Sequence, residues 1–244
     1  MKTTTQFFNL PRLTAISLSF LYLLVSAPTT IAFQEAPAPI NVKTEYCADS
    51  STKDETVVIP VGTKYGSTLE IASYVAETFC RNGYMTDVFL AEDLLGDNEE
   101  GTVLAEYDVI VIGSNIMYDE WWPQVLELIE LEHETLANKL VTFFIVSAAM
   151  QDPTWSDYVD QNYMQPVLDT LKISWGIEPF VEGGLLGGRV DYVGMDIFDL
   201  IPMVIMDILM DLMGFPLDFG PGDYVSKTAA EAWAQQVIDV LEPK

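Results

Sequence analysis

Basic residues are scarce in this chain. Its 244 residues include 11 Lys and Arg against 37 Asp and Glu, so the formal net charge is −26. No Lys or Arg occurs between Arg81 and Lys139. Proteins that bind DNA or RNA need cationic side chains to replace the counterions of the phosphates. The composition therefore argues against a nucleic-acid partner.

Residues suited to metal or thiol chemistry are also few. The chain has one histidine, His133, and two cysteines, Cys47 and Cys80. One histidine cannot supply a histidine-based zinc or haem site, and we expect no disulfide framework or metal cage from the two cysteines. His133 lies in a polar stretch, which favours a solvated histidine at a helix end. We expect no metal, and any cofactor to be organic.

Apolar residues, by contrast, are abundant. Half of the residues are hydrophobic and the mean hydropathy is +0.22, which is enough to bury a sizeable core. The length corresponds to one domain of ordinary size with additional segments, or to two small ones at most.

The N-terminus has the pattern of an export signal. Lys2 and Arg12 precede an uncharged run, residues 13–25, and small residues follow as far as Ala32. This order predicts a secretory signal peptide over residues 1–32, with an uncleaved membrane anchor as the alternative. Cleavage would leave 9 basic residues (11 minus 2) against 37 acidic ones, a charge of −28. We therefore expect an exported protein.

Beyond the signal, the composition changes twice. Residues 33–55 are rich in Ala, Pro, Ser and Thr, which predicts a flexible linker. Residues 56–244 alternate β-branched runs with amphipathic ones. Strands are predicted at 56–61, 85–90, 108–113, 140–146 and 177–186, and helices at 69–79, 124–136, 158–171 and 227–241. The alternation predicts an α/β fold, a doubly wound five-stranded parallel sheet with helices on both faces.

Ligands of such sheets bind at the carboxyl ends of the strands. The first loop there runs from Thr63 to Thr68 and combines hydroxyl groups with Gly66 and a helix N-terminus. These groups can hold a phosphate without many cations. The loop lacks the glycine spacing of a dinucleotide fingerprint and the Gly-Lys-Ser/Thr of a Walker motif. The alternative is a helix start capped by Ser or Thr after a glycine turn.

Two further loops differ in chemistry. Residues 114–122 contain Tyr118, Trp121 and Trp122, whose side chains can stack on a planar ring or anchor the loop to the next helix. Residues 147–153 are small and polar, which suits close approach to the edge of a ring.

The order and spacing of these segments resemble the flavodoxin-like FMN-binding domain family, and most closely its menaquinone-dependent protoporphyrinogen dehydrogenase subgroup. The resemblance extends over about residues 57–241. It is carried by residues 63–68, 70–72, 111–118, 143–147, 187–192, 213–214 and 232–234. It implies an FMN-dependent redox protein that transfers electrons or hydride, with a quinone or a redox protein as candidate partner.

The resemblance also implies a set of cofactor-binding residues. The phosphate would lie on the first loop, at Thr63, Lys64, Tyr65, Gly66, Ser67 and Thr68. The ring would lie between the second loop, at Ser114, Asn115, Ile116, Met117, Tyr118 and Trp121, and the third, at Ser147, Ala148 and Asp152. No catalytic acid, base or nucleophile can be identified.

A hydrophobic insertion at about 193–226 precedes the last predicted helix. Its apolar stretch, 197–213, has aspartates on one side of the helical circumference, and Pro202 is predicted to kink or restart the helix. The stretch could contact a membrane, a quinone or a partner protein, or it could pack across the domain. Three functions remain open: an FMN-dependent enzyme, an electron carrier, and a flavin-free binding module on the same fold.

Overall fold

The computed structural model describes residue 47 and residues 52–96, 103–213 and 220–242. The predicted signal segment and most of the predicted linker lie outside these residues. Within them, no helix combines the length and apolarity needed to cross a membrane.

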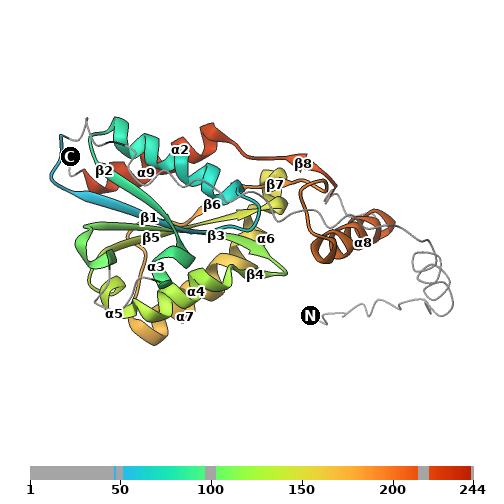
Figure 1. Cartoon of the computed structure of the whole chain (residues 1–244), viewed down its shortest axis with the longest axis horizontal. Coiled ribbons are helices and arrows are strands. Elements are labelled where there is room, and N and C mark those ends of the chain that lie inside the picture. The colour runs from blue at the N-terminus through green and yellow to red at the C-terminus, as the bar shows by residue number, and fades with distance from the viewer. Residues whose placement is uncertain (1–46, 48–51, 97–102, 214–219, 243–244) are drawn as a thin grey trace, which may run out of the picture. The chain divides into compact units, whose positions relative to one another are not determined.

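The centre of the domain is a parallel sheet (Figure 1). Its five main strands lie in the order β2-β1-β3-β5-β6, and all four neighbouring pairs are parallel. The strands are β1 (Thr56–Gly62), β2 (Met85–Leu90), β3 (Val109–Met117), β5 (Leu140–Ser147) and β6 (Gly184–Gly187). This is the flavodoxin-like strand order, so the predicted fold class is confirmed. A two-residue strand, β4 (Glu120–Trp121), folds back antiparallel on the end of β3.

Helices cover both faces of the sheet (Figure 1). One face packs against α2 (Ser67–Arg81) and α9 (Lys227–Leu241), and the other against α4 (Pro123–Leu131) and α7 (Gln165–Trp175). Successive side chains of a strand point to opposite faces, so Val57 joins the first core and Val58 the second. Both are fully buried, which explains why the strands are apolar throughout.

The remaining elements are short or lie at the edges. The helical ones are α3 (Ala91–Gly96), α5 (His133–Leu136), α6 (Ser156–Val159), a π-helical turn (Asp160–Met164), and 3₁₀ turns at Val103–Glu106, Ala148–Gln151 and Pro153–Trp155. The insertion contributes α8 (Ile197–Met213) and β8 (Gly222–Asp223), and β8 pairs antiparallel with β7 (Arg189–Val190), which precedes the insertion.

Some predicted boundaries are wrong. The fifth strand, predicted at 177–186, is confined to Gly184–Gly187. Ile177 precedes it as a buried anchor of the second core, so the apolar pattern there reflects packing rather than a strand. The helix predicted at 158–171 extends from Ser156 to Trp175 through the π-helical turn. The helix predicted at 124–136 is divided at Glu132 into α4 and α5.

The two cysteines form a disulfide, which the sequence analysis did not predict. Cys47 and Cys80 are bonded with their Cα atoms 5.4 Å apart, and Cys47 is 5% exposed. The N–H groups of Thr52 and Lys53 both donate to the carbonyl of Gly83, at 3.0 and 3.1 Å. The described end of the predicted flexible linker is therefore attached to the C-terminal end of α2. A spacing of 33 residues could not reveal this pairing, because it depends on the fold.

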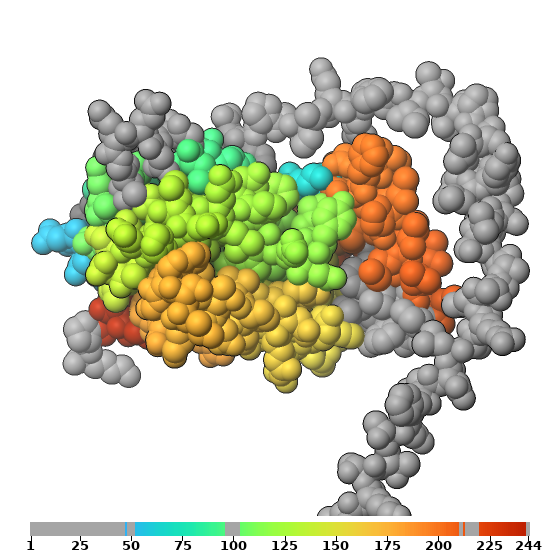
Figure 2. Space-filling model, turned by 90° about the horizontal axis from the view of Figure 1, so that it is seen from below, coloured from blue at the N-terminus to red at the C-terminus, as the bar shows by residue number. Residues whose placement is uncertain are grey.

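Helix α8 lies at one end of the domain, beyond the carboxyl ends of the strands (Figures 1 and 2). Asp196 caps it, because its carboxylate accepts hydrogen bonds from the N–H groups of Phe198 and Asp199 at 2.9 and 3.1 Å. The helix continues through Pro202. The predicted restart at this proline is therefore wrong, and the alternative of a kink stays a prediction. Pro202 is the sixth residue of α8, so its missing N–H leaves the carbonyl of Phe198 without a helical donor; the hydroxyl of Tyr118 donates to that carbonyl at 3.5 Å.

Candidate functional site

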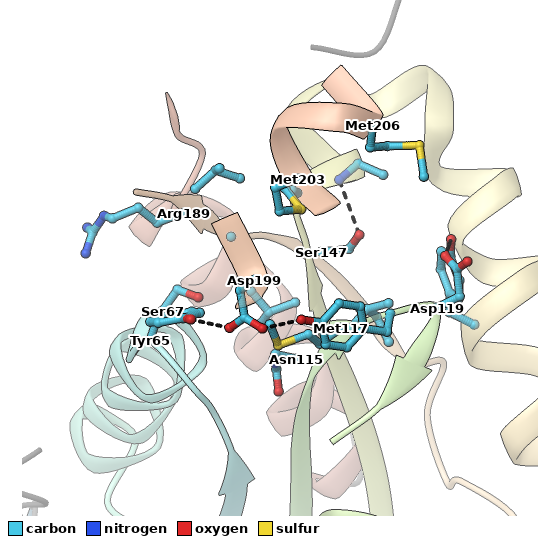
Figure 3. A pocket seen from close by; sticks show the side chains of 18 of the residues that line it. Tyr65, Ser67, Asn115, Met117, Asp119, Ser147, Arg189, Asp199, Met203 and Met206 are labelled. Carbon is cyan, nitrogen blue, oxygen red and sulfur yellow. Dashed lines mark hydrogen bonds between the residues drawn. The ribbon is translucent and has the colours of Figure 1, made fainter. Parts of the chain in front are cut away.

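A cavity of about 690 Å³ lies between the carboxyl ends of β1, β3 and β5 and the inner side of α8 (Figure 3). Its walls come from the three loops described above and from Gly188, Arg189 and Val190 of the loop at 183–192, which the sequence also places at this edge, and α8 covers it. Its position matches the rule that ligands of open parallel sheets bind at the carboxyl edge.

The first loop forms a cradle at the start of α2. Gly66 is the N-cap with φ of 86°, a left-handed conformation that glycine adopts without strain. Its N–H donates to Thr63 Oγ1 at 3.0 Å, and Thr63 and Ser67 line the cavity. Thr68 Oγ1 is buried and has no hydrogen-bond partner among the described residues. A buried hydroxyl without a partner beside the free N–H groups of a helix N-terminus fits an anion such as a phosphate.

The second loop is a strained hairpin between β3 and β4. Tyr118 and Asp119 have φ of 53° and 64°, the left-handed region that favours glycine. Such strain is retained where the surrounding structure requires the conformation, and it is common at functional sites. Asn115 and Tyr118 line the cavity, and Asn115 Oδ1 is a second buried acceptor without a partner in the described structure.

The third loop begins a 3₁₀ turn at the end of β5. Ser147 caps the turn, because its Oγ accepts a hydrogen bond from the N–H of Ala149 at 3.2 Å. Ser147, Ala148 and Ala149 present small side chains to the cavity, so a ligand can approach the backbone closely.

An aromatic wall follows the third loop. It consists of Trp155, Tyr158 and Tyr163, whose neighbouring rings meet edge to face with centroids 5.5 and 6.0 Å apart. Tyr163 lies in the π-helical turn and donates to Asp119 Oδ1 at 2.8 Å. Burial, and then the hydrogen bond to Asp119, raise the pKa of Tyr163 well above its ordinary value. Tyr163 therefore stays neutral and holds Asp119 at the tip of the second loop.

The roof of the cavity is the inner side of α8 and the residues before it. Met195, Met203 and Met206 line it together with Pro202 (Figure 3). Methionine side chains are flexible and polarizable, so they adapt to ligands of different shape.

One buried carboxylate joins the roof to the loops. Asp199 is 1% exposed and points from α8 toward Tyr65 (Figure 3). Its oxygens accept hydrogen bonds from the hydroxyl groups of Tyr65 and Tyr118, and Lys64 Nζ lies 2.5 Å from Oδ2. Lys64 also pairs with Asp196 at 2.9 Å. We call these five residues the Asp199 cluster.

The cluster stabilises its own protonation states. Burial alone would lower the pKa of Lys64, but hydrogen bonds to Asp199 and Asp196 outweigh it and raise that pKa. Burial and the hydrogen bond to Asp199 raise the pKa of Tyr65, and the hydrogen bond to Asp199 raises the pKa of Tyr118. Lysine is therefore charged and both tyrosines are neutral at neutral pH.

The structure places most of the residues expected to bind the cofactor around one cavity. Nine of them line it: Thr63, Tyr65, Ser67, Asn115, Ile116, Met117, Tyr118, Ser147 and Ala148. Gly66 and Thr68 form the base of the first loop rather than its lining surface.

The other four have different positions from those expected. Lys64 turns to Asp199 and Asp196. Ser114 is fully buried, and its Oγ accepts from the N–H of Trp122 at 2.8 Å. Trp121 is in the second core, with Nε1 donating to the carbonyl of Tyr163 at 2.8 Å. The carboxylate of Asp152 accepts from the N–H of Thr154 at 2.9 Å. These residues shape the loops instead of contacting the cavity.

Comparison with known families agrees with this architecture. The sequence profile described as the flavodoxin domain matches residues 58–210, which is more than half of the chain. None of the curated proteins matches the chain.

The solved structures that match this chain are distant from it in sequence. Flavodoxin 1 from Bacillus cereus is 18% identical, with 57% of this chain and 88% of that chain covered and a TM-score of 0.40. A flavodoxin, WrbA-like protein from Agrobacterium tumefaciens is 16% identical, with coverage of 77% and 97% and a TM-score of 0.44. Rubredoxin oxygen:oxidoreductase from Desulfovibrio gigas is 14% identical and has a TM-score of 0.43; 80% of this chain is covered, but 38% of that one.

The chain therefore belongs to the flavodoxin domain family. Membership of this family indicates that the protein binds a flavin and takes part in redox electron transfer.

Proposed function

We propose that this member of the flavodoxin domain family is an exported redox protein whose cofactor is FMN. The observation that carries the proposal is the cradle at the start of α2, where Thr68 Oγ1 is buried without a partner among the described residues. A phosphate at the N-terminus of α2 would supply that partner and interact favourably with the helix dipole.

The chain would hold the phosphate mainly with neutral donors. These donors are the hydroxyl groups of Thr63, Ser67 and Thr68 and the N–H groups of the first turn of α2. The nearby cations are already engaged: Lys64 pairs with Asp199, and Arg189 lies 2.9 Å from Glu70 and 2.8 Å from Asp223. FMN is the better candidate than riboflavin, because only the phosphorylated form satisfies this cradle.

The ring would lie between the second and third loops. Asn115 offers its buried acceptor to a ring N–H, and the small residues from Ser147 to Ala149 leave room for an edge. When bound, FMN supplies the electron-accepting ring, and the protein orients it and sets its electrostatic surroundings. Acidic side chains at the cavity, Asp119 and Asp199, disfavour added negative charge there.

A neutral, planar reaction partner such as a quinone is favoured over an anionic one. The methionine roof and the aromatic wall leave an apolar space beside the loops. A porphyrinogen carries carboxylates, which a cationic side chain would bind. The second loop presents Met117 and Asp119 to the cavity, and neither is cationic. The alternative of a pure electron carrier uses the same cavity but requires no second molecule in it.

Export is supported by the disulfide between Cys47 and Cys80, because disulfides persist mainly in oxidising compartments. Membrane contact is supported by the outer side of α8. Phe198 is 82% exposed, Ile208 60% and Leu212 77%, an apolar surface unusual for a helix in water.

The cofactor is tested by incubating the mature protein, residues 33–244, with excess FMN, desalting it and recording the absorption spectrum. We expect about one FMN retained per chain. Thr68→Ala should weaken retention, because it removes the buried hydroxyl. Thr170→Ala is the matched control, since Thr170 is exposed on α7 and its hydroxyl bonds only to the carbonyl of Pro166 among the interactions described.

Loss of flavin from the wild type at every salt concentration would refute the FMN proposal and favour a flavin-free binding module. With flavin retained, reduction of a soluble quinone analogue distinguishes the enzyme from the carrier. Co-sedimentation with vesicles of neutral lipid tests the membrane contact, which Phe198→Ser with Leu212→Ser should abolish.

A further inference from the structure

Helix α8 turns Asp199, Met203 and Met206 toward the domain, and most of its other large apolar residues outward. Asp199 is 1% exposed, whereas Phe198 beside it is 82% exposed. An amphipathic helix on a soluble domain normally buries its apolar side, and this burial holds it in place. The contacts of Asp199 therefore carry an unusual share of the energy that positions α8.

Those contacts reach two separate loops. Asp199 Oδ2 accepts from Tyr65 and pairs with Lys64, both in the first loop. Asp199 Oδ1 accepts from Tyr118, in the second loop, where the left-handed backbone directs the side chain over the cavity. One carboxylate thus connects α8 to two of the three loops that border the cavity.

We propose that Asp199 is a positioning residue that fastens α8 over the cavity as a lid and so controls the entry and exit of the ligand. The ligand in this inference is the flavin of the proposed function, but the fastening itself is a property of the ligand-free chain.

The chemistry of the cluster supports a strong but releasable contact. A buried carboxylate is stable only when it is paired, and Asp199 has one cation and two hydroxyl donors. Removing it takes the closest partner from Lys64, Tyr65 and Tyr118. The longer hydrogen bonds of Tyr65 to Asp196, at 3.3 Å, and of Tyr118 to the carbonyl of Phe198, at 3.5 Å, remain. Replacing the apolar outer residues breaks none of these contacts.

The test follows the binding of FMN by its fluorescence in stopped-flow mixing. In Asp199→Ala we expect the dissociation rate constant to rise by about tenfold or more, because hydrogen bonds to a charged group are lost. The association rate constant should rise as well, because the lid no longer covers the cavity. Tyr118→Phe removes one of the three contacts and should give a smaller increase in the same direction.

Asp196→Asn is the control for simple electrostatics. Asp196 also pairs with Lys64, but its side chain is 47% exposed. The variant removes the same charge, and asparagine caps a helix as well as aspartate does. Both rate constants should stay within about twofold of the wild type. Equal changes in Asp196→Asn and Asp199→Ala would assign the effect to charge and overturn the proposal.

A readout without ligand separates the lid from the cofactor. Chymotrypsin cleaves at large apolar residues once a segment opens, and α8 carries several of them. In the ligand-free protein, cleavage within residues 197–213 should be about tenfold faster in Asp199→Ala than in the wild type or in Asp196→Asn.

The outcomes are distinct. If the wild type binds no FMN but Asp199→Ala accelerates cleavage, the positioning role of Asp199 is supported and the proposed cofactor is refuted. If FMN binds and neither the rate constants nor the cleavage change in Asp199→Ala, the positioning role is refuted while the cofactor stands.

Discussion

Helices α8 and α9 have similar lengths but turn different sides toward the domain. Helix α9 has 15 residues and buries its apolar side, including Trp233 and Val237, in the core beside α2. Helix α8 has 17 residues, exposes apolar residues such as Phe198 and buries Asp199. Both sequences are amphipathic, so the pattern alone does not say which side faces the domain.

Because the two helices bury different groups, we expect α9 to determine stability and α8 to determine access of the ligand. Apolar burial depends on area and has no direction, so α9 is part of the folded core. A carboxylate contact depends on a few specific partners, so it can be broken and remade without unfolding the domain. The two helices therefore should respond to mutation in different ways.

The largest expected effect is on α9. Trp233 packs on Phe144 with ring centroids 5.5 Å apart and donates from Nε1 to the carbonyl of Glu182 at 3.1 Å. Trp233→Ala should lower the free energy of unfolding by about 3–5 kcal/mol, measured by urea denaturation. Val240→Ala, at a position 54% exposed on the same helix, should cost under about 0.5 kcal/mol. Equal costs would mean that α9 is not part of the core.

The disulfide should have the next largest effect, because it belongs to the same layer as α9. Cys80 lies in α2, and the bond closes a separation of 33 residues. Reducing it should lower the free energy of unfolding by about 2–4 kcal/mol in parallel urea curves. In the Cys47→Ser, Cys80→Ser double variant, the reductant should have no effect. An identical curve for the oxidised and reduced wild type would contradict the prediction.

On α8, substitutions of the outer side should leave stability almost unchanged. Phe198 and Leu212 are 82% and 77% exposed, so Phe198→Ser with Leu212→Ser should change the free energy of unfolding by less than about 0.5 kcal/mol each. A loss comparable to that of Trp233→Ala would show that the outer side of α8 is covered within the domain.

The smallest effect concerns the ionisation of two tyrosines. Asp199 raises the pKa of Tyr118 by its hydrogen bond, and burial and Asp199 raise that of Tyr65, so both keep their protons above pH 10. A raised pKa contributes stability that is present below the ordinary value of 10.0 and is lost as the pH rises through the raised one. In Asp199→Asn, the tyrosinate absorbance should appear at lower pH than in the wild type. Superimposed titration curves would contradict the hydrogen bonds.

The sequence predicted the sheet and the three loops because their signals are local. A continuous apolar run such as residues 109–112 requires cover on both faces, and the carboxyl ends of parallel strands share one edge. The fifth strand was misplaced because Ile177 is apolar for a different reason, packing against the second core.

The roof and the disulfide could not be predicted in the same way. Aspartates on one side of α8 are ordinarily exposed, and nothing in the sequence shows that Lys64, Tyr65 and Tyr118 converge on Asp199. The aromatic residues at 155, 158 and 163 are a signal in the sequence from which this wall can be predicted. Contacts between distant segments appear only when the fold brings them together.

Amide hydrogen exchange of the whole mature protein, with and without FMN, tests whether α8 covers a flavin site. We expect slower exchange in residues 198–209 of α8 and in the first turn of α2 when FMN is bound, with no change in α9. Protection of the α2 turn without protection of α8 would contradict the lid, and no protection at either place would contradict the flavin site itself.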